Sequence, residues 1–140
     1  MELNRERLLE LVQKYGAPIY VYDANKIKSQ YEKMTNAFST VKRLKLNYAC
    51  KANTNINILK YFKSLGSGLD TVSIQEVELG LLAGFKPKEI IYTPNGVSYT
   101  EIKKVIELGV RINIDNLSVL ETFGQDFPKY PVCVRINPHI

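Results

Sequence analysis

Short strand-like runs alternate with helical runs from residue 44 to residue 136. The strand-like runs lie at residues 44–50, 69–72, 89–92, 111–115 and 131–136. Apolar residues at helical spacing predict helices between them, at about residues 56–65, 76–83, 99–108 and 118–123. Strands that are separated by helices and joined by short connections are typical of βα units, which form a parallel sheet. The alternation therefore predicts an α/β fold.

The residues before this region follow a different order. Apolar spacing predicts a helix at about residues 3–15, and Asp23 is placed to cap a second helix that ends near Phe38. Between these helices, residues 19–22 (IYVY) are rich in β-formers and predict a short strand.

Polar and apolar residues alternate within the strand-like runs in a way that indicates a barrel. Ile112 and Ile114 share one face of their strand, and Arg111, Asn113 and Asp115 share the other. In a (β/α)8 barrel, apolar side chains meet the helix layer and polar ones point inward near the mouth. Five strands are visible, whereas a closed barrel needs eight and typically about 250 residues. We therefore predict a partial (β/α)8 TIM-type barrel, the front portion of a longer protein.

Composition and charge exclude several classes of protein. The 140 residues carry a net charge of +5, but the lysines are spread along helical faces without an Arg-rich cluster, which argues against nucleic-acid binding. No run approaches the roughly 20 apolar residues of a membrane span, and the charged N-terminus does not resemble a signal peptide. Cys50 and Cys133 lie in strand-like runs and are interpreted as buried thiols in a reducing compartment. We expect a cytoplasmic protein that binds a small molecule.

Lys51 stands where the first barrel strand ends and a polar turn begins. Because burying an unpaired ammonium is costly, lysine normally avoids such a position. Partial desolvation lowers the pKa of a lysine and frees its amine to attack a carbonyl. The alternative is a strand-end lysine that extends into solvent.

Five segments, in order, carry a resemblance to a known family. They are YACKAN at residues 48–53, GLDTVS at 68–73, YTPNG at 92–96, GVRINID at 109–115 and VRINP at 134–138. Together they resemble the fold-type III pyridoxal-phosphate-dependent decarboxylases, whose barrel is like that of the alanine racemases. Within the family they are most similar to the diaminopimelate decarboxylases. The resemblance implies decarboxylation of meso-diaminopimelate to L-lysine, as a step of lysine biosynthesis. The alternatives are decarboxylation of ornithine, arginine or carboxynorspermidine, or a non-catalytic pyridoxal-phosphate-binding barrel.

The resemblance also implies roles for particular residues. Lys51 matches the catalytic lysine that bonds to pyridoxal 5'-phosphate through its amine. Asp70, Glu76 and Arg135 match cofactor-binding residues, and we expect no metal ion. Local alternatives stay open: Asp70 as a turn cap, Glu76 as a first-turn helix carboxylate, and Arg135 as an ion-pair partner of Asp115 or Asp70.

Several groups that the family uses match no stretch of this sequence. They are the glycine-rich phosphate cradle, the carboxylate at the pyridine nitrogen, the histidine stacked on the ring and the C-terminal β domain. We do not assign His139 to the stacking role. We interpret residues 1–140 as the N-terminal part of the barrel domain, inactive in isolation. The full-length enzyme is expected to be a homodimer.

Overall fold

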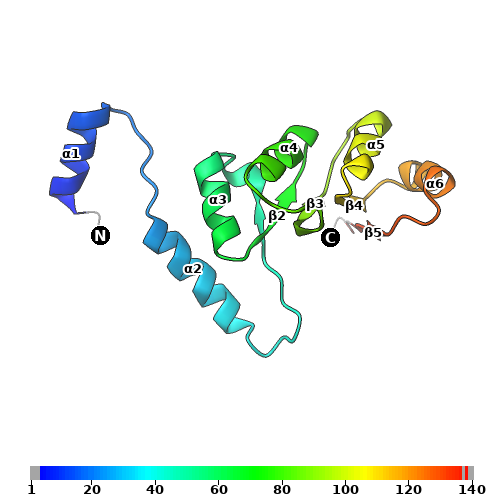
Figure 1. Cartoon of the computed structure of the whole chain (residues 1–140), viewed down its shortest axis with the longest axis horizontal. Coiled ribbons are helices and arrows are strands. Elements are labelled where there is room, and N and C mark those ends of the chain that lie inside the picture. The colour runs from blue at the N-terminus through cyan, green and yellow to red at the C-terminus, as the bar shows by residue number, and fades with distance from the viewer. Residues whose placement is uncertain (1–3, 137, 139–140) are drawn as a thin grey trace. The chain divides into compact units, whose positions relative to one another are not determined.

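The computed structural model describes residues 4–136 and residue 138, and it divides the chain into two compact units, Met1–Leu44 and Lys45–Ile140. The first unit holds two helices, α1 (Arg5–Tyr15) and α2 (Ala24–Ala37) (Figure 1). The Asp23 carboxylate accepts hydrogen bonds from the amides of Asn25 and Lys26, and thereby caps α2. Both helices and this cap were predicted from the sequence.

The predicted strand at residues 19–22 is wrong. These residues form no regular secondary structure, and 92% of the Tyr20 side chain is exposed. A strand is stabilised by hydrogen bonds to a neighbouring strand, and no described residue of this unit supplies one. The β-forming residues are there, but composition alone does not provide a pairing partner.

The second unit is a parallel sheet in which the strands follow chain order, β1-β2-β3-β4-β5. The strands are β1 (Asn47–Ala49), β2 (Gly68–Thr71), β3 (Ile90–Tyr92), β4 (Arg111–Ile114) and β5 (Val132–Val134). The helices are α3 (Ile56–Ser64), α4 (Ile74–Leu82), α5 (Tyr99–Glu107) and α6 (Leu117–Asp126), and short 3-10 turns lie at η1 (Cys50–Ala52) and η2 (Pro87–Glu89). One α-helix follows each of the first four strands, and these helices lie along one side of the sheet (Figure 1). This confirms the predicted α/β fold with five barrel strands.

The strand register places apolar and polar side chains on opposite faces. On the face toward the helices, Leu69, Ile90 and Ile112 are fully or almost fully buried. On the other face, Asp70 pairs in register with Ala49, and the side chain of Asp70 is only half-buried. The predicted apolar, helix-facing side is confirmed for β2, β3 and β4, but at the last strand Val134 and Ile136, predicted for the same side, are exposed.

A partly buried hydrogen-bond junction fixes α4 and α5 to the sheet. The Tyr92 hydroxyl donates to Glu101 Oε1 at 2.6 Å, and the same oxygen accepts the amide of Ile74 at 2.9 Å. Burial, followed by the bond to Glu101, raises the pKa of Tyr92 well above its ordinary value. The phenol therefore stays protonated and holds the start of α4 next to α5. Within the described residues, no helix has the length and apolar character needed to cross a lipid bilayer.

Candidate active site

Three polar side chains join across the inner face of the sheet. Thr93, the residue after β3, donates its hydroxyl to Asp70 Oδ1 on β2 at 2.8 Å. Asn113 on β4 donates from Nδ2 to Thr93 Oγ1 at 2.9 Å. We call Asp70, Thr93 and Asn113 the polar row. It brings side chains from neighbouring strands together near their carboxyl ends, where barrel enzymes carry their active sites.

Lys51 lies in the η1 turn that directly follows β1, the neighbour of β2 in the sheet. Ala49, two residues earlier, pairs with Asp70 of the row. The Tyr48 hydroxyl donates to the carbonyl of Asn53 at 3.2 Å across the turn. The Tyr48 ring stacks on the ring of Phe62 in α3, with 4.0 Å between the two ring centroids. The turn is therefore anchored from the helix side, and Lys51 projects from an ordered backbone.

The sequence predicted that the Lys51 side chain is partly buried. In the structure this side chain is exposed. β1 is the first strand in the sheet order, so it has a neighbour on one side only. Nothing among the described residues covers the lysine from the other side. The sequence located the strand end correctly but could not show how open this edge is.

Cys50, directly before Lys51, is fully buried as predicted, whereas Cys133, which was also predicted to be buried, is exposed. Burial, and after it the negative charges of Glu76 and Asp70, raise the pKa of the Cys50 thiol to about 11. Both carboxylates therefore act electrostatically on the lysine turn. A buried, protonated thiol at this position is a packing residue rather than a nucleophile.

We expect Cys50 to react with iodoacetamide at pH 8 about 100-fold more slowly in the folded full-length protein than in urea. The thiolate is the reactive form, and a pKa raised from 9.0 to about 11 lowers its fraction about 100-fold at that pH. The stabilisation that the neutral thiol provides is complete below pH 9 and is lost as the pH rises toward 11. Mass spectrometry of the Cys50 peptide measures the rate, and rapid labelling of the native protein would contradict the burial.

Glu76 is engaged in a local cap. Its Oε2 accepts the amide of Val72 at 2.8 Å, and its own amide donates to Ser73 Oγ at 3.3 Å. These bonds satisfy donors at the start of α4, the local role that the sequence left open for this carboxylate. A cofactor-binding role for Glu76 stays a prediction.

Arg135 follows β5, and its amide donates to the carbonyl of Ile114 at 2.8 Å. Its exposed side chain, together with Asp115, borders an open cavity of about 250 Å³. Between these described residues, neither of the ion pairs considered for Arg135, with Asp115 or with Asp70, is formed. Asn137 and His139 lie outside the described residues, and the cofactor role of Arg135 stays a prediction.

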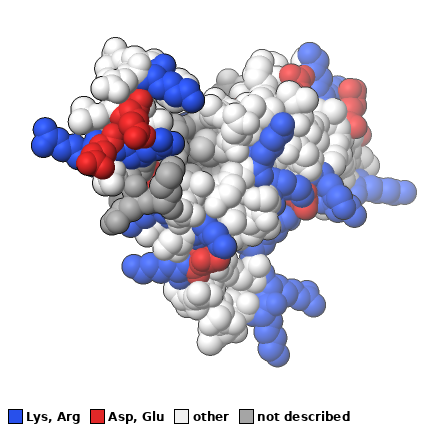
Figure 2. Space-filling view, turned by 60° about the vertical axis from the view of Figure 1, so that its left-hand side comes forward, with Lys and Arg blue, Asp and Glu red and all other residues white. Residues whose placement is uncertain are grey.

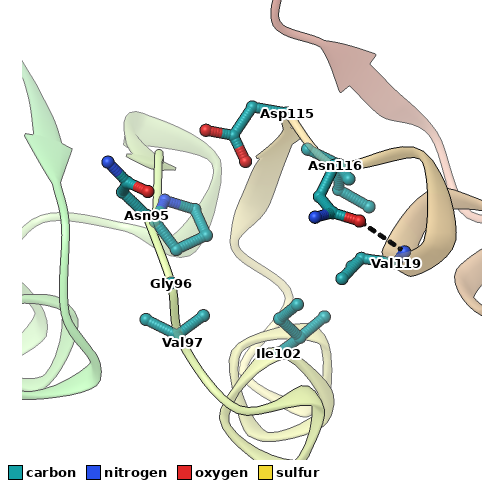
Figure 3. A pocket seen from close by; sticks show the side chains of 9 residues that line it. Asn95, Gly96, Val97, Ile102, Asp115, Asn116 and Val119 are labelled. Atoms are coloured by element: carbon teal, nitrogen blue, oxygen red, sulfur yellow. Dashed lines mark hydrogen bonds between the residues drawn. The ribbon is translucent and has the colours of Figure 1, made fainter.

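A second cavity, of about 340 Å³, opens between the loops that follow β3 and β4 (Figure 3). Asn95 and Asp115 lie at its opening. Asn116 Oδ1 accepts a hydrogen bond from the backbone amide of Val119 at 3.2 Å, so the Asn116 side chain caps α6. Ile102 of α5 forms part of its wall. The cavity therefore lies toward the helix layer, whereas the polar row faces the inner side of the sheet.

Thr93 was not among the site residues expected from the sequence. The signal that could have found it is register. Thr93 lies two residues after Ile91, which pairs with Asp70, so Thr93 and Asp70 share a face. Asn113 lies on the predicted polar face of its strand, and its bond to Thr93 agrees with that placement.

Residues 24–140 match the family model described as "Pyridoxal-dependent decarboxylase, pyridoxal binding domain". The chain belongs to this family. It is 39% identical over 132 residues to the diaminopimelate decarboxylase of Methanothermobacter thermautotrophicus, covering 93% of this chain and 31% of that protein. The chain thus spans about a third of the length of its decarboxylase relatives.

Solved structures of the decarboxylase family show the same fold. Diaminopimelate decarboxylase from Helicobacter pylori, complexed with L-lysine, superposes with a TM-score of 0.81 at 37% identity, covering 95% of this chain and 35% of that one. Lysine/ornithine decarboxylase from Vibrio vulnificus, complexed with putrescine, gives a TM-score of 0.83 at 27% identity, covering 96% and 38%. The five-stranded unit is therefore part of the decarboxylase barrel.

The residues present fit the cofactor of this family. Pyridoxal phosphate needs a primary amine that can reach its aldehyde, and Lys51 offers an exposed amine at a strand end. The inner face of the neighbouring strands carries the hydrogen-bonded side chains of Asp70, Thr93 and Asn113. Among the described residues, by contrast, no three His, Cys, Asp or Glu side chains are grouped to hold a metal ion.

Proposed function

We propose that residues 1–140 form the N-terminal part of the barrel domain of a decarboxylase that converts meso-diaminopimelate to L-lysine. The observation that carries this proposal is the exposed side chain of Lys51 in the turn directly after β1, the strand whose last residue, Ala49, pairs with Asp70 of the polar row. The similarity to diaminopimelate decarboxylases supports the substrate.

In this function Lys51 holds pyridoxal phosphate through its amine. When bound, the cofactor supplies an electron sink that makes loss of carbon dioxide from an amino acid feasible. Asp70 presents a carboxylate that is held by the Thr93 hydroxyl, and this charge orients cationic groups at the site. Arg135 presents an exposed guanidinium after β5, which is suited to anionic groups of the substrate or cofactor. Glu76, through its negative charge near the turn, supports the same arrangement.

The alternative substrates are other basic amino acids. The similarity to lysine/ornithine decarboxylase supports this alternative. We expect the full-length protein to release carbon dioxide from meso-diaminopimelate at least tenfold faster than from ornithine, arginine or carboxynorspermidine. The assay measures carbon dioxide and the amine product together. Faster turnover of another amino acid would overturn the substrate assignment. Cofactor binding without turnover of any of them would favour the non-catalytic barrel.

The active unit is, in this proposal, a cytoplasmic homodimer that binds neither nucleic acid nor membrane. Lys and Arg side chains are dispersed over the face drawn in Figure 2, with Asp and Glu among them, and this distribution supports a small-molecule site over a nucleic-acid surface. Light scattering of the full-length protein measures the oligomeric state. We also expect residues 1–140 alone to lack decarboxylase activity, because no stretch of the sequence matches the family's phosphate cradle.

A further inference from the structure

The polar row has a defined hydrogen-bond direction. Asn113 Nδ2 is a donor only, so Thr93 Oγ1 must accept from it. The single hydroxyl proton of Thr93 is then directed to Asp70 Oδ1, 2.8 Å away. Asp70 therefore acts as the acceptor at the end of a chain that runs from β4 through β3 to β2. The bond to a carboxylate oxygen is charge-assisted, which makes it stronger than a bond between neutral groups.

The row restrains Asp70 through one oxygen and leaves the other open. Among the described residues, Asp70 Oδ2 accepts no hydrogen bond, and the side chain is half-buried. A carboxylate held through Oδ1 cannot rotate freely, so its second oxygen keeps a fixed direction. This property serves a residue that must present charge to a neighbour at a set position.

We propose that Thr93 and Asn113 are positioning residues for Asp70 in cofactor binding. Thr93 fixes the Asp70 carboxylate directly, and Asn113 fixes the orientation of the Thr93 hydroxyl. The inference rests on the proposed function, since it assigns the row to the same cofactor site. It adds two residues, contributed by β4 and by the end of β3, to the cofactor site proposed above.

The test uses the full-length protein with Thr93→Val, which keeps the side-chain shape and removes the hydroxyl. Pyridoxal phosphate is titrated into the cofactor-free protein, and binding is followed by absorbance. We expect Thr93→Val to weaken cofactor binding at least tenfold. Thr93→Ser keeps the hydroxyl, and its cofactor affinity should lie within about twofold of the wild-type value. Asn113→Ala is expected to have a smaller effect than Thr93→Val, because it acts through Thr93.

Thr71 supplies the matched control. It stands on β2 next to Asp70, but it is buried and donates its hydroxyl to the carbonyl of Ile91 at 3.0 Å. Thr71→Val thus removes a threonine hydroxyl bond that does not involve Asp70. We expect it to lower the Tm and leave the cofactor affinity of the folded protein within about twofold of the wild type.

The outcomes separate the two proposals. Wild-type affinity in Thr93→Val, or failure of Thr93→Ser to restore binding, overturns the positioning role while the proposed function stands. Equal weakening by Thr71→Val and Thr93→Val also overturns it, because the effect then follows general stability. A wild-type protein that binds no pyridoxal phosphate overturns the proposed function and the positioning role together.

Discussion

Replacing Lys51 with alanine in the full-length protein is expected to lower kcat/KM at least about 1000-fold, equivalent to about 4 kcal/mol of transition-state stabilisation. The same substitution should remove the absorbance of covalently bound pyridoxal phosphate. The amine is the group that bonds to the cofactor, and alanine offers no nucleophile in its place. Because the side chain is exposed, its removal leaves no cavity, and we expect little change in the Tm.

Two further variants sharpen this test. Lys51→Arg keeps the positive charge but supplies a guanidinium that stays protonated, so it should be as inactive as Lys51→Ala. Lys60→Ala removes an exposed lysine from α3 and should leave activity within about twofold of the wild type. Borohydride reduction of the wild-type protein should fix the cofactor to the peptide that contains Lys51, as mass spectrometry would show. An absorbance band that survives in Lys51→Ala would show that another residue holds the cofactor.

The sequence predicted those parts of the fold that depend on local pattern. The βα alternation indicated the parallel sheet, and alternation within strands indicated the two faces, because each depends on the periodicity of neighbouring residues. Strand ends were less accurate. The first barrel strand was predicted at residues 44–50, but the ladder covers only Asn47–Ala49 and the chain then enters the η1 turn. Pairing ends where the neighbouring strand ends, and the local sequence does not contain that information.

Features that depend on distant partners were missed. The run at residues 19–22 has β-forming residues but no strand beside it. The exposure of Lys51 depends on the position of β1 at the start of the sheet order. The bond from Thr93 to Asp70 joins residues 23 positions apart, and only the register of β2 and β3 brings them together. For the site, the motif identified the lysine, and the structure supplied the hydrogen-bonded surroundings.

Gly80 is the buried glycine of α4. We expect that adding a small side chain at this position lowers the stability of the fold more than at the other glycines. A Cβ at Gly80 would lie 2.5 Å from Leu69 Cδ2 and 3.2 Å from Ile90 Cδ1, both in the core. Glycine allows α4 to pack directly on β2 and β3. We expect Gly80→Val to lower the free energy of unfolding by about 3 kcal/mol, because overpacking costs about 1–3 kcal/mol per site and valine adds three carbons.

Gly124 provides the matched control, because it lies in the interior of α6 and a Cβ added there would meet nothing within 4 Å. Valine and glycine differ by only a few tenths of a kcal/mol in helix propensity, so Gly124→Val should change stability by less than about 0.5 kcal/mol. Urea unfolding of the full-length protein, with amide hydrogen exchange at β2 and β3, measures both variants. Similar losses at the two glycines would mean that helix propensity, rather than close packing, sets the cost.

A double-mutant cycle identifies the clash itself. Leu69→Ala alone should cost about 2–5 kcal/mol, since it removes a fully buried side chain from the core. It also removes the Cδ2 atom that a new side chain at Gly80 would meet. The double mutant Leu69→Ala with Gly80→Val should therefore be less destabilised than the sum of the two single mutants, by at least about 1 kcal/mol. Strict additivity would place the strain of Gly80→Val somewhere other than the contact between α4 and β2.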